Sequence, residues 1–407
     1  MEKGKSKMSE IASAGMLMPK ESLLEVQRQK SNLFIGIPKE TSFQENRISL
    51  TPDAVGLLMN NGHEVILEAG AGKAAFFSDA EYSEAGARIV YNTEEVFKAD
   101  IILKVAPPSE KEISLFHHKQ NLVSILQLNT QNEKFFKALS AKKVTALAFD
   151  YIKDRSGIYP IIQSMSEIAG STALLIAAEY LSNVMHGRGE MLGGISGIPP
   201  TKVVILGAGT VGEFATRTAI GLGAEVKVFD NSLYKLRRLQ NYLGTRLYTS
   251  VIAPDTLGNA LLTADVVIGA LAPVAGRSPC VITEEMVSRM RNGSVIVDVS
   301  IDAGGCVETS SVTNHTDPTF IKYGVIHYCV PNIASRVART ASYALSNVLT
   351  PILLNMEQVG GFEQSLWADS GVRHGIYMYK GSITNKYIAE LYKMPFKDIN
   401  LFMAARM

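Results

Sequence analysis

Short apolar runs alternate with helix-like periods along most of this chain. Runs rich in β-branched residues between glycine, proline or polar clusters are typical of buried strands, whereas apolar residues three and four apart are typical of helices. The alternation predicts an α/β fold in which helices cover a mostly parallel sheet. In the first part of the chain we expect strands at residues 33–37, 64–68, 88–91, 100–105, 122–126 and 144–149, and helices at 52–61, 79–85 and 132–140.

A second series of strands follows a long helical stretch, 166–185, and a segment rich in glycine and proline, 187–200. These six strands fit the usual size of a dinucleotide-binding domain. After them come an apolar helix, 338–355, and a terminal helix near 384–391, with no further strand expected, so the tail should pack back on the first domain. The second series of strands is expected at 203–206, 225–229, 246–249, 266–268, 294–299 and 325–328.

The predicted architecture is two doubly wound parallel-sheet domains, with a Rossmann-type domain inserted into a discontinuous first domain. At 407 residues the chain is too long for one typical core, which also favours two domains. Residues 21–29 could form a short amphipathic helix, or the whole N-terminal extension could be uninformative. The predicted boundaries are 1–32 for the extension, 33–165 with 338–407 for the first domain, and 166–337 for the inserted domain.

The segment that follows the strand at 203–206 carries the most specific motif, Gly207-x-Gly209-x-x-Gly212, with a helical pattern directly after it. In a dinucleotide site the first glycine permits a tight turn, the second lets a pyrophosphate approach, and the third lets helix and strand pack closely. The start of the helix offers free N–H groups and the positive end of its dipole to phosphates. The residues expected to contact the cofactor here are Gly207, Gly209, Thr210, Val211 and Gly212.

The next strand, 225–229, ends in Asp230, 18 residues after Gly212. An acid at this position accepts hydrogen bonds from ribose hydroxyls and repels a 2′-phosphate, so NAD is favoured over NADP. The alternative interpretation is a glycine-rich turn that closes an ordinary strand–helix unit.

Composition narrows the possible functions. The chain is 46% hydrophobic and 19% charged with a formal charge of +1, which gives no electrostatic signature of nucleic-acid or membrane binding. Glu179 and Pro351 interrupt the longest apolar helices, and the N-terminal residues lack the apolar run of a signal peptide. The three cysteines contain no CxxC pair, so we expect neither a disulfide framework nor a metal site. These features favour a cytoplasmic protein.

Charged residues at strand ends are the candidates for substrate chemistry, because ligands of open parallel sheets bind outside the carboxyl ends of the strands. Lys104 ends an apolar strand before two prolines, where it could meet an anion or could snorkel to the surface. Arg47 lies in a polar loop and could hold a carboxylate bidentately, or could be a surface arginine. Of Asp298 and Asp302, one could cap the following loop while the other polarises water or ammonia.

Several separate motifs give the chain a family resemblance. From about residue 33 to 395 it resembles alanine dehydrogenases of the alanine dehydrogenase/transhydrogenase family. Besides the glycine turn, the matching segments are Gly-Ile-Pro-Lys-Glu at 36–40, Asn-Arg-Ile-Ser-Leu-Thr-Pro at 46–52, Gly-His-Glu-Val at 62–65, Glu-Ala-Gly-Ala-Gly at 68–72, Leu-Lys-Val at 103–105, Met-Ser-Glu-Ile-Ala-Gly at 165–170, Asp-Ala-Gly-Gly-Cys at 302–306 and Tyr-Ala-Leu-Ser-Asn at 343–347.

The resemblance implies a two-domain subunit of a homohexamer that reversibly converts L-alanine, water and NAD to pyruvate, ammonia and NADH. It places the family's substrate-binding arginine and lysine on Arg47 and Lys104, and its active-site aspartate on Asp302. The expected contacts to NAD are Ser166, Asp230, Lys235 near the ribose and Asn332 near the nicotinamide.

One position departs from the family pattern. Alanine dehydrogenases carry a catalytic histidine where this chain has Gln127, and glutamine cannot carry a proton at neutral pH. We expect burial beside Arg47 to lower the pKa of Lys104, so that Lys104, or water held by Asp302, supplies the proton chemistry. The departure leaves two other interpretations open: the NAD-binding component of a proton-translocating transhydrogenase, and a catalytically silent NAD-binding sensor.

Overall fold

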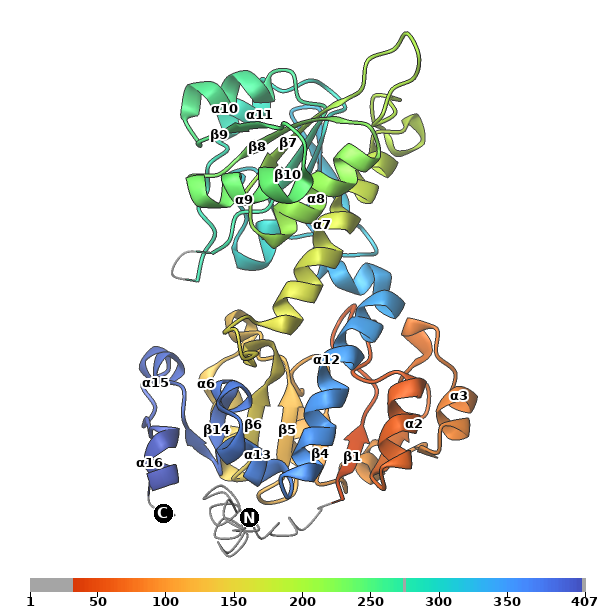
Figure 1. Cartoon of the computed structure of the whole chain (residues 1–407), viewed down its shortest axis with the longest axis vertical. Coiled ribbons are helices and arrows are strands. Elements are labelled where there is room, and N and C mark those ends of the chain that lie inside the picture. Colours follow the sequence, from red (N-terminus) through yellow and green to blue (C-terminus); the bar gives the residue numbers. More distant parts are fainter. Residues whose placement is uncertain (1–31, 274–275, 405–407) are drawn as a thin grey trace, which may run out of the picture.

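The protein folds into two lobes, each built around one mainly parallel sheet (Figure 1). The structure is a computed structural model and describes residues 32–273 and 276–404. Two long helices, α7 (Pro160–Tyr180) and α12 (Ala338–Gln358), run between the lobes and pack against each other. The predicted α/β class with two doubly wound sheets is confirmed. The extension and its candidate helix at 21–29 lie outside the described residues.

The first sheet has the strand order β15-β14-β6-β5-β4-β1-β2-β3 within the described residues. Strands β1 to β6 are parallel in the order expected of a doubly wound fold, and β14 and β15 extend the β6 edge in antiparallel fashion. The bounds are β1 Phe34–Ile37, β2 Glu64–Glu68, β3 Arg88–Val90, β4 Ile101–Leu103, β5 Asn121–Ser124, β6 Thr145–Ala148, β14 Ile376–Tyr379 and β15 Ser382–Ile383.

The second sheet has the order β12-β13-β11-β10-β7-β8-β9. Six strands repeat the doubly wound order, and β12 pairs antiparallel with β13 at one edge. The bounds are β7 Lys202–Leu206, β8 Glu225–Phe229, β9 Tyr248–Ser250, β10 Val266–Gly269, β11 Val295–Asp298, β12 Thr319–Lys322 and β13 Val325–Tyr328.

Helices cover both faces of each sheet, and short 3-10 turns follow several strands at their carboxyl ends. The remaining α-helices are α2 Pro52–Asn60, α3 Asp79–Glu84, α4 Thr93–Val96, α5 Glu110–Leu115, α6 Glu133–Ala141, α8 Thr210–Gly221, α9 Leu233–Leu243, α10 Pro254–Leu261, α11 Glu284–Ser288, α13 Phe362–Ala368, α14 Ser370–His374, α15 Lys386–Leu391 and α16 Ile399–Ala404. The 3-10 turns are η1 Lys73–Ala75, η2 Leu128–Thr130, η3 Phe149–Tyr151, η4 Asn183–Met185, η5 Val299–Ala303 and η6 Ile333–Val337.

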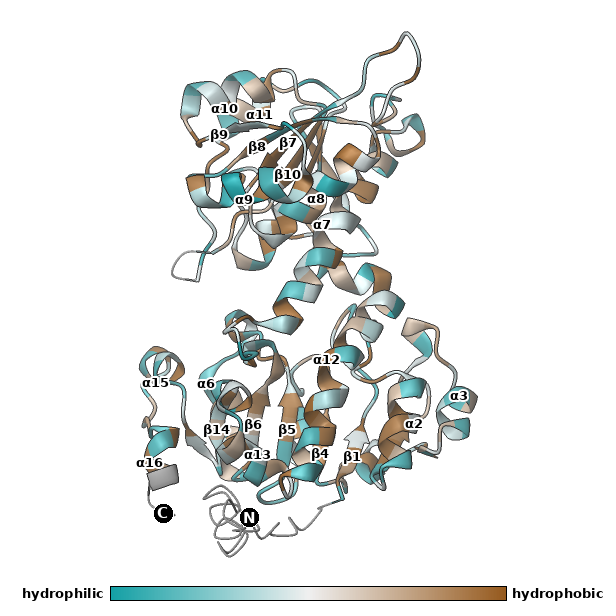
Figure 2. Cartoon of the chain, in the orientation of Figure 1, coloured by the Kyte–Doolittle hydropathy of each residue, from teal (hydrophilic) through white to brown (hydrophobic). Residues whose placement is uncertain are grey.

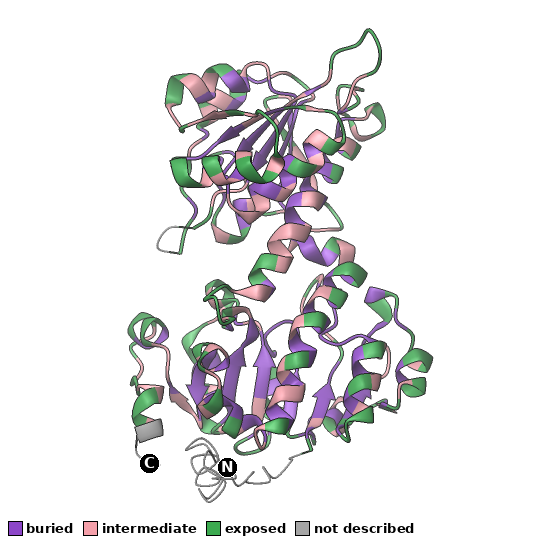
Figure 3. Cartoon of the chain, in the orientation of Figure 1, coloured by how far each residue is buried: buried purple, intermediate pink, exposed green. Residues whose placement is uncertain are grey.

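Both faces of each sheet are buried, which explains why the strands are continuous apolar runs. Along β7, alternate residues enter opposite cores: Val203 and Ile205 join one hydrophobic cluster, and Val204 and Leu206 join another. The strands are accordingly hydrophobic in Figure 2 and buried in Figure 3, while polar residues lie on the outer faces of the helices.

The tail of the chain corrects one prediction. No strand was expected after residue 338, yet β14 and β15 join the first sheet beside β6. The four apolar residues that follow Gly375 are too short a run for periodicity to separate strand from loop, and only the exposed edge of β6 decides the matter. Strand β12 was missed in the same way, β9 begins at Tyr248 instead of residue 246, and α7 begins at Pro160 instead of residue 166.

Helix α7 is the one described helix that is long and apolar enough to cross a membrane by length and composition, which the sequence expectation did not foresee. It packs along α8 and against α12, and its buried residues include Ala173, Leu174 and Ile176. A core helix passes the same test of length and composition.

Candidate active site

The carboxyl ends of the two sheets meet across the space between the lobes. The loop that follows β1 contacts the segment that follows β13: Asn46 N donates to Ser335 Oγ at 2.9 Å, and Asn332 Nδ2 donates to Glu45 Oε2 at 3.0 Å. The same loop reaches residues 314–316 through the side chain of Gln44. This arrangement places the ligand edges of both doubly wound sheets against one another.

Arg47 is buried at this meeting point, with 5% of its surface exposed. Its Nε and Nη2 donate to the two carboxylate oxygens of Glu45 at 2.7 and 2.6 Å, and its Nη1 lies 3.4 Å from Met165 Sδ on α7. Burial opposes ionisation of Glu45, but the Arg47 guanidinium outweighs burial and holds the pKa of Glu45 below its ordinary value. The guanidinium therefore already has one bidentate carboxylate partner and uses three of its five N–H donors on Glu45 and Met165.

Lys104 is sealed from solvent one residue after β4. Its Nζ lies 2.7 Å from Glu112 Oε1 and 3.3 Å from Glu40 Oε2. Burial alone would lower the pKa of Lys104, but the charges of Glu40 and Glu112 outweigh it and raise that pKa above its ordinary value. The expectation of a lowered pKa for Lys104 is wrong, because the sequence did not reveal the two acids. Lys104 is a permanent cation here.

Local helix capping puts Glu112 beside Lys104. After the two prolines, Ser109 caps α5, and its N–H and hydroxyl each donate to Glu112 Oε2 at 2.7 Å. This capping box turns the other carboxylate oxygen toward Lys104. The sequence signal for this contact is Ser-x-x-Glu directly after the strand that ends in Lys104 and its two prolines.

Glu40 is the second acid that the sequence analysis left without a role. Its Oε1 accepts from Val105 N at 2.5 Å, so it ties the loop after β1 to the residue that follows Lys104. Burial raises the pKa of Glu40 to about 7, although the charge of Lys104 opposes that rise. Glu40 is therefore partly protonated near neutral pH.

Gln127 lies just beyond β5 and adopts the left-handed backbone conformation, with φ 44° and ψ 54°. Its side chain is exposed. Non-glycine residues in this region are uncommon and cluster at functional sites. The structure thus places Gln127 on the carboxyl edge of the first sheet, where the resemblance had placed a catalytic residue.

Asp302 and Asn332 of the second lobe lie near Arg47 and Glu45 of the first lobe. Asp298 is the capping acid, since it accepts from Ser300 N, Cys306 N and Ser310 Oγ and is 1% exposed. Asp302 Oδ1 accepts from Asn332 N at 3.0 Å, and burial of the carboxyl group raises the pKa of Asp302, although the residue as a whole is exposed. Asp302 is therefore the acid left to act on a ligand, and its charge also acts on Arg47.

The glycine turn has the geometry that a dinucleotide requires. Gly207 has φ +106°, and a Cβ there would lie 2.3 Å from Ala270 O. A Cβ on Gly212 would lie 1.9 Å from Gly207 O, so the turn and helix α8 touch at this point. A Cβ on Gly209 would meet nothing within 4 Å, which leaves open space above the N-terminus of α8, at Thr210 and Val211. The residues present fit a pyrophosphate.

Asp230 braces this turn. Its Oδ2 accepts from Ala208 N at 2.8 Å and its Oδ1 from Ser232 N at 2.7 Å, and it is 7% exposed. Lys235 lies in the first turn of α9, which follows Asp230 directly. Ser166 lies on α7 beside Met165 and is half-buried. Two groups of predicted residues result, one around Arg47 and one around the glycine turn.

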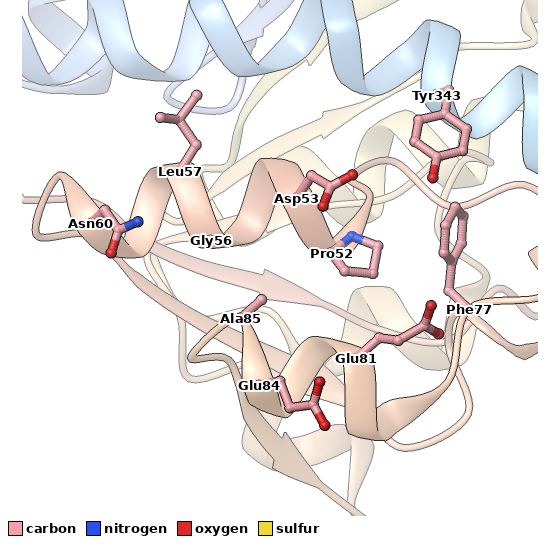
Figure 4. A pocket seen from close by; sticks show the side chains of 10 residues that line it. All are labelled: Pro52, Asp53, Gly56, Leu57, Asn60, Phe77, Glu81, Glu84, Ala85 and Tyr343. Atoms are coloured by element: carbon pink, nitrogen blue, oxygen red, sulfur yellow. The ribbon is translucent and has the colours of Figure 1, made fainter.

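A groove in the described chain lies away from these residues. It has a volume of about 560 Å³ between α2 and α3 and shares no residue with the Arg47 and Lys104 group (Figure 4). Asp53 on α2 faces Glu81 and Glu84 on α3 across the groove, and the rings of Phe77 and Tyr343 lie at one end. The candidate site is thus defined by the residues at the carboxyl ends of the strands and not by the volume of a groove.

Comparison with known families agrees with this geometry. The model named "Alanine dehydrogenase/PNT, N-terminal domain" matches residues 36–169, and the model named "Alanine dehydrogenase/PNT, C-terminal domain" matches residues 173–386. The chain belongs to the alanine dehydrogenase/PNT family.

Individual relatives of this alanine dehydrogenase/PNT chain share most of its length. It is 38% identical to alanine dehydrogenase 2 of Staphylococcus aureus (strain Mu50) over 369 residues, which cover 90% of this chain and 98% of that protein. A solved L-alanine dehydrogenase matches with TM-score 0.84 and 35% identity over 88% of this chain and 99% of that one. A transhydrogenase from Sinorhizobium meliloti matches with TM-score 0.74 and 26% identity over 87% of this chain and 99% of that one.

Proposed function

We propose that this chain is an NAD-dependent alanine dehydrogenase that converts L-alanine and water to pyruvate and ammonia, and the reverse. The observation that carries the proposal is the meeting of the two carboxyl edges, with buried Arg47 and Lys104 on one and the glycine turn on the other. The similarity to alanine dehydrogenases over nearly the whole chain supports it. NAD, when bound, would accept the α-hydrogen of alanine as hydride.

The NAD would be held by Gly207, Gly209, Thr210, Val211, Gly212, Asp230, Lys235, Ser166 and Asn332. Backbone N–H groups at the start of α8 would bind the pyrophosphate, and the Asp230 carboxylate would accept from the ribose. Both oxygens of Asp230 keep a lone pair beyond their backbone hydrogen bonds, so this second role is compatible with the first.

The substrate carboxylate would bind between Arg47 and Lys104. Glu45 accepts one N–H each from Nε and Nη2 of Arg47, and Lys104 keeps a third N–H beyond its contacts with Glu40 and Glu112. Lys104 therefore keeps one N–H and Arg47 keeps two, which suits a single small carboxylate. Holding that carboxylate fixes the α-carbon relative to the cofactor, which is the orientation on which hydride transfer depends.

The test of the proposed activity is NADH oxidation by the purified chain with pyruvate and ammonium together. We expect oxidation only when both are present, and reduction of NAD when L-alanine alone is supplied. Pyruvate without ammonium is the control, because a lactate-type reduction would need no ammonia. An inactive chain that still binds NADH would contradict the proposal.

A second candidate, a silent NAD-binding protein or a transhydrogenase component, is favoured by Gln127 and by the transhydrogenase match. The variant Gln127→His, assayed in both directions, separates the two functions. A wild-type chain without activity and an active histidine variant would support the silent protein. Activity in the wild-type chain, changed by less than about tenfold in the variant, would support the dehydrogenase.

The assembly, compartment and domain boundaries are further parts of the proposal. We propose a homohexamer in the cytoplasm, with a substrate domain of residues 33–165 and 338–407 around an NAD-binding domain of 166–337. The pairing of β14 with β6 supports the return of the tail to the first domain. Light scattering of the purified chain would test the number of subunits.

A further inference from the structure

Asp150 lies at the candidate site although neither the motifs nor the resemblance pointed to it. It follows β6 by two residues, within η3, and so occupies the same carboxyl edge as Lys104 and Gln127. The parallel registers Leu103 with Val123 and Ser124 with Ala148 align these strand ends side by side. The charge of Arg47 and the backbone of Leu126, the residue before Gln127, both act on its carboxylate.

The Asp150 carboxyl is poorly satisfied for a group in this position. Its Oδ1 is sealed from solvent and has no hydrogen-bond partner among the described residues, and the same holds for the hydroxyl of Tyr377 on β14. Burial, and then the charge of Asp150, raise the pKa of the Tyr377 phenol, so the two groups are electrostatic neighbours. An orphaned acid oxygen at a ligand edge calls for an explanation, and a role toward a ligand is one.

Other groups at this edge are poorly suited to move protons. The pKa of Lys104 is raised by its two acids, so it stays charged, and Gln127 does not titrate. Glu40 is committed to Lys104 and to the N–H of Val105. Asp302 lies on the second lobe, where its Oδ1 accepts from Asn332 N. Asp150 is the acid on the substrate side that has a carboxylate oxygen, Oδ1, without a hydrogen-bond partner among the described residues.

We propose that Asp150 is the general acid–base of this site, acting directly on the water and the amine that exchange at the substrate's α-carbon. The inference rests on the proposed function, because it assumes an amino acid held by Arg47 and Lys104. Burial raises the pKa of Asp150 to about 7, partly opposed by backbone hydrogen bonds and the charge of Arg47. A carboxyl that is half ionised near neutral pH can accept and return a proton with little loss.

The proton steps balance on Asp150 alone. Alanine reacts as its neutral amine, after its ammonium proton has passed to solvent, and once the α-hydrogen has left as hydride the substrate is an α-iminium acid. Water adds to the α-carbon: its oxygen–carbon bond forms, the C=N π pair returns to nitrogen, and the ionised Asp150 takes the proton that the water loses. Asp150 then returns this proton to the amine nitrogen. The C–N bond breaks as ammonia leaves, an oxygen lone pair forms the C=O bond, and the hydroxyl proton passes to Asp150 and on to solvent.

The charged and titratable groups around Asp150 set its pH response. Arg47 faces it from the loop after β1, Tyr151 follows it in η3, and Tyr377 faces it from β14. His374 on α14 contacts the backbone oxygen of Tyr151 at 3.0 Å. Arg47 favours the charged form of Asp150, and both phenols have raised pKa values, so they stay neutral where Asp150 titrates.

The test compares Asp150→Asn with Asp154→Asn, an exposed aspartate on the same connection between β6 and α7. Asparagine keeps the size of the side chain but cannot carry the proton. We expect kcat of Asp150→Asn to fall by about 10² or more in both directions, with loss of the inflection near pH 7 in kcat/KM. The Kd for NADH, measured by fluorescence, should stay within about twofold, and Asp150→Glu should recover part of kcat. Asp154→Asn should behave as wild type.

A readout without turnover guards against misfolding of the variant. Infrared difference spectra of the ligand-free wild type should show carboxyl groups titrating near pH 7, among them Glu40 and Asp150, and the Asp150 contribution should be missing from Asp150→Asn. If the wild type is active and Asp150→Asn keeps its kcat and pH profile, the Asp150 assignment is overturned while the proposed function stands. The same conclusion follows if the inflection near pH 7 is lost in Asp302→Asn and kept in Asp150→Asn. A wild-type chain without alanine dehydrogenase activity would instead overturn the proposed function, and the infrared titration would still report on Asp150.

Discussion

The six parallel strands of each sheet have the same order, but the groups at their carboxyl ends differ in charge and type. On the first sheet, the loops after β1, β4 and β6 carry Arg47, Lys104 and Asp150; Arg47 and Lys104 are buried beside other charges, and Asp150 is half-buried. On the second sheet, the turn after β7 is made of glycines and offers backbone N–H groups instead of side chains. One edge is suited to a small charged molecule, and the other to a long ligand that needs room near the backbone.

The difference shows that the doubly wound fold fixes where a ligand binds and leaves open which ligand it is. The first edge holds an excess of acids over cations, with Glu40, Glu45 and Glu112 around Arg47 and Lys104. Burial, and to a smaller extent the charge of Glu45, raises the pKa of Glu40 to about 7 against the opposing charge of Lys104, so a proton is held close to the cation pair. The role proposed for the second edge is to bind the cofactor, which needs no such cluster of acids because binding involves no proton exchange.

The largest effect should come from removing a cation of the first edge. Lys104→Ala leaves Glu40 and Glu112 without their counter-charge and removes one of two contacts to the substrate carboxylate. We expect kcat/KM for alanine to fall by about 10³, while NADH fluorescence shows unchanged binding at the other edge. Lys111→Ala, on the exposed face of α5, is the matched control. Near-normal turnover in Lys104→Ala would contradict the assignment of substrate binding to the first edge.

A pair of glycine variants should sharpen the description of the second edge. Gly209→Ala adds a Cβ to open space, so stability should hold while NADH affinity falls by about tenfold, because the phosphates need that space. Gly212→Ala pushes a Cβ against Gly207 O and should cost about 1–3 kcal/mol of unfolding free energy as well. Gly258→Ala in α10, also open, should affect neither binding nor fold adversely. Equal melting temperatures for Gly209→Ala and Gly212→Ala would contradict this geometry.

The smallest effect concerns stability and pH. The pKa of Asp150 is raised to about 7 in the folded chain, so between about pH 4 and 7 the folded state binds more protons than the unfolded state. The unfolding free energy should therefore fall as the pH rises through this window. Asp150→Asn should remove about 1–2 kcal/mol of that fall, allowing for the partial exposure of the residue. Denaturant unfolding at pH 5 and pH 8 measures it, and a slope equal to that of wild type would count against a raised pKa.

The sequence predicted most of the fold because the strands are continuous apolar runs and the glycine motif has a fixed context. It located Arg47, Lys104, Asp302 and Asn332, which the structure brings together at one interlobe edge. It missed β12, β14 and β15, short strands at sheet edges whose pairing depends on a neighbour and not on their own pattern.

By itself the sequence determined the α/β class, the doubly wound order and the chemical type of each strand end, because these follow from local periodicity and from residues fixed to strand termini. Only the tertiary structure decided the ionisation of those residues. The pKa of Lys104 is raised and not lowered, because the capping of α5 and the loop after β1 bring Glu112 and Glu40 to it. Asp150 became a candidate only when folding removed its solvent and left one oxygen without a partner, since a pKa depends on surroundings that no single segment contains.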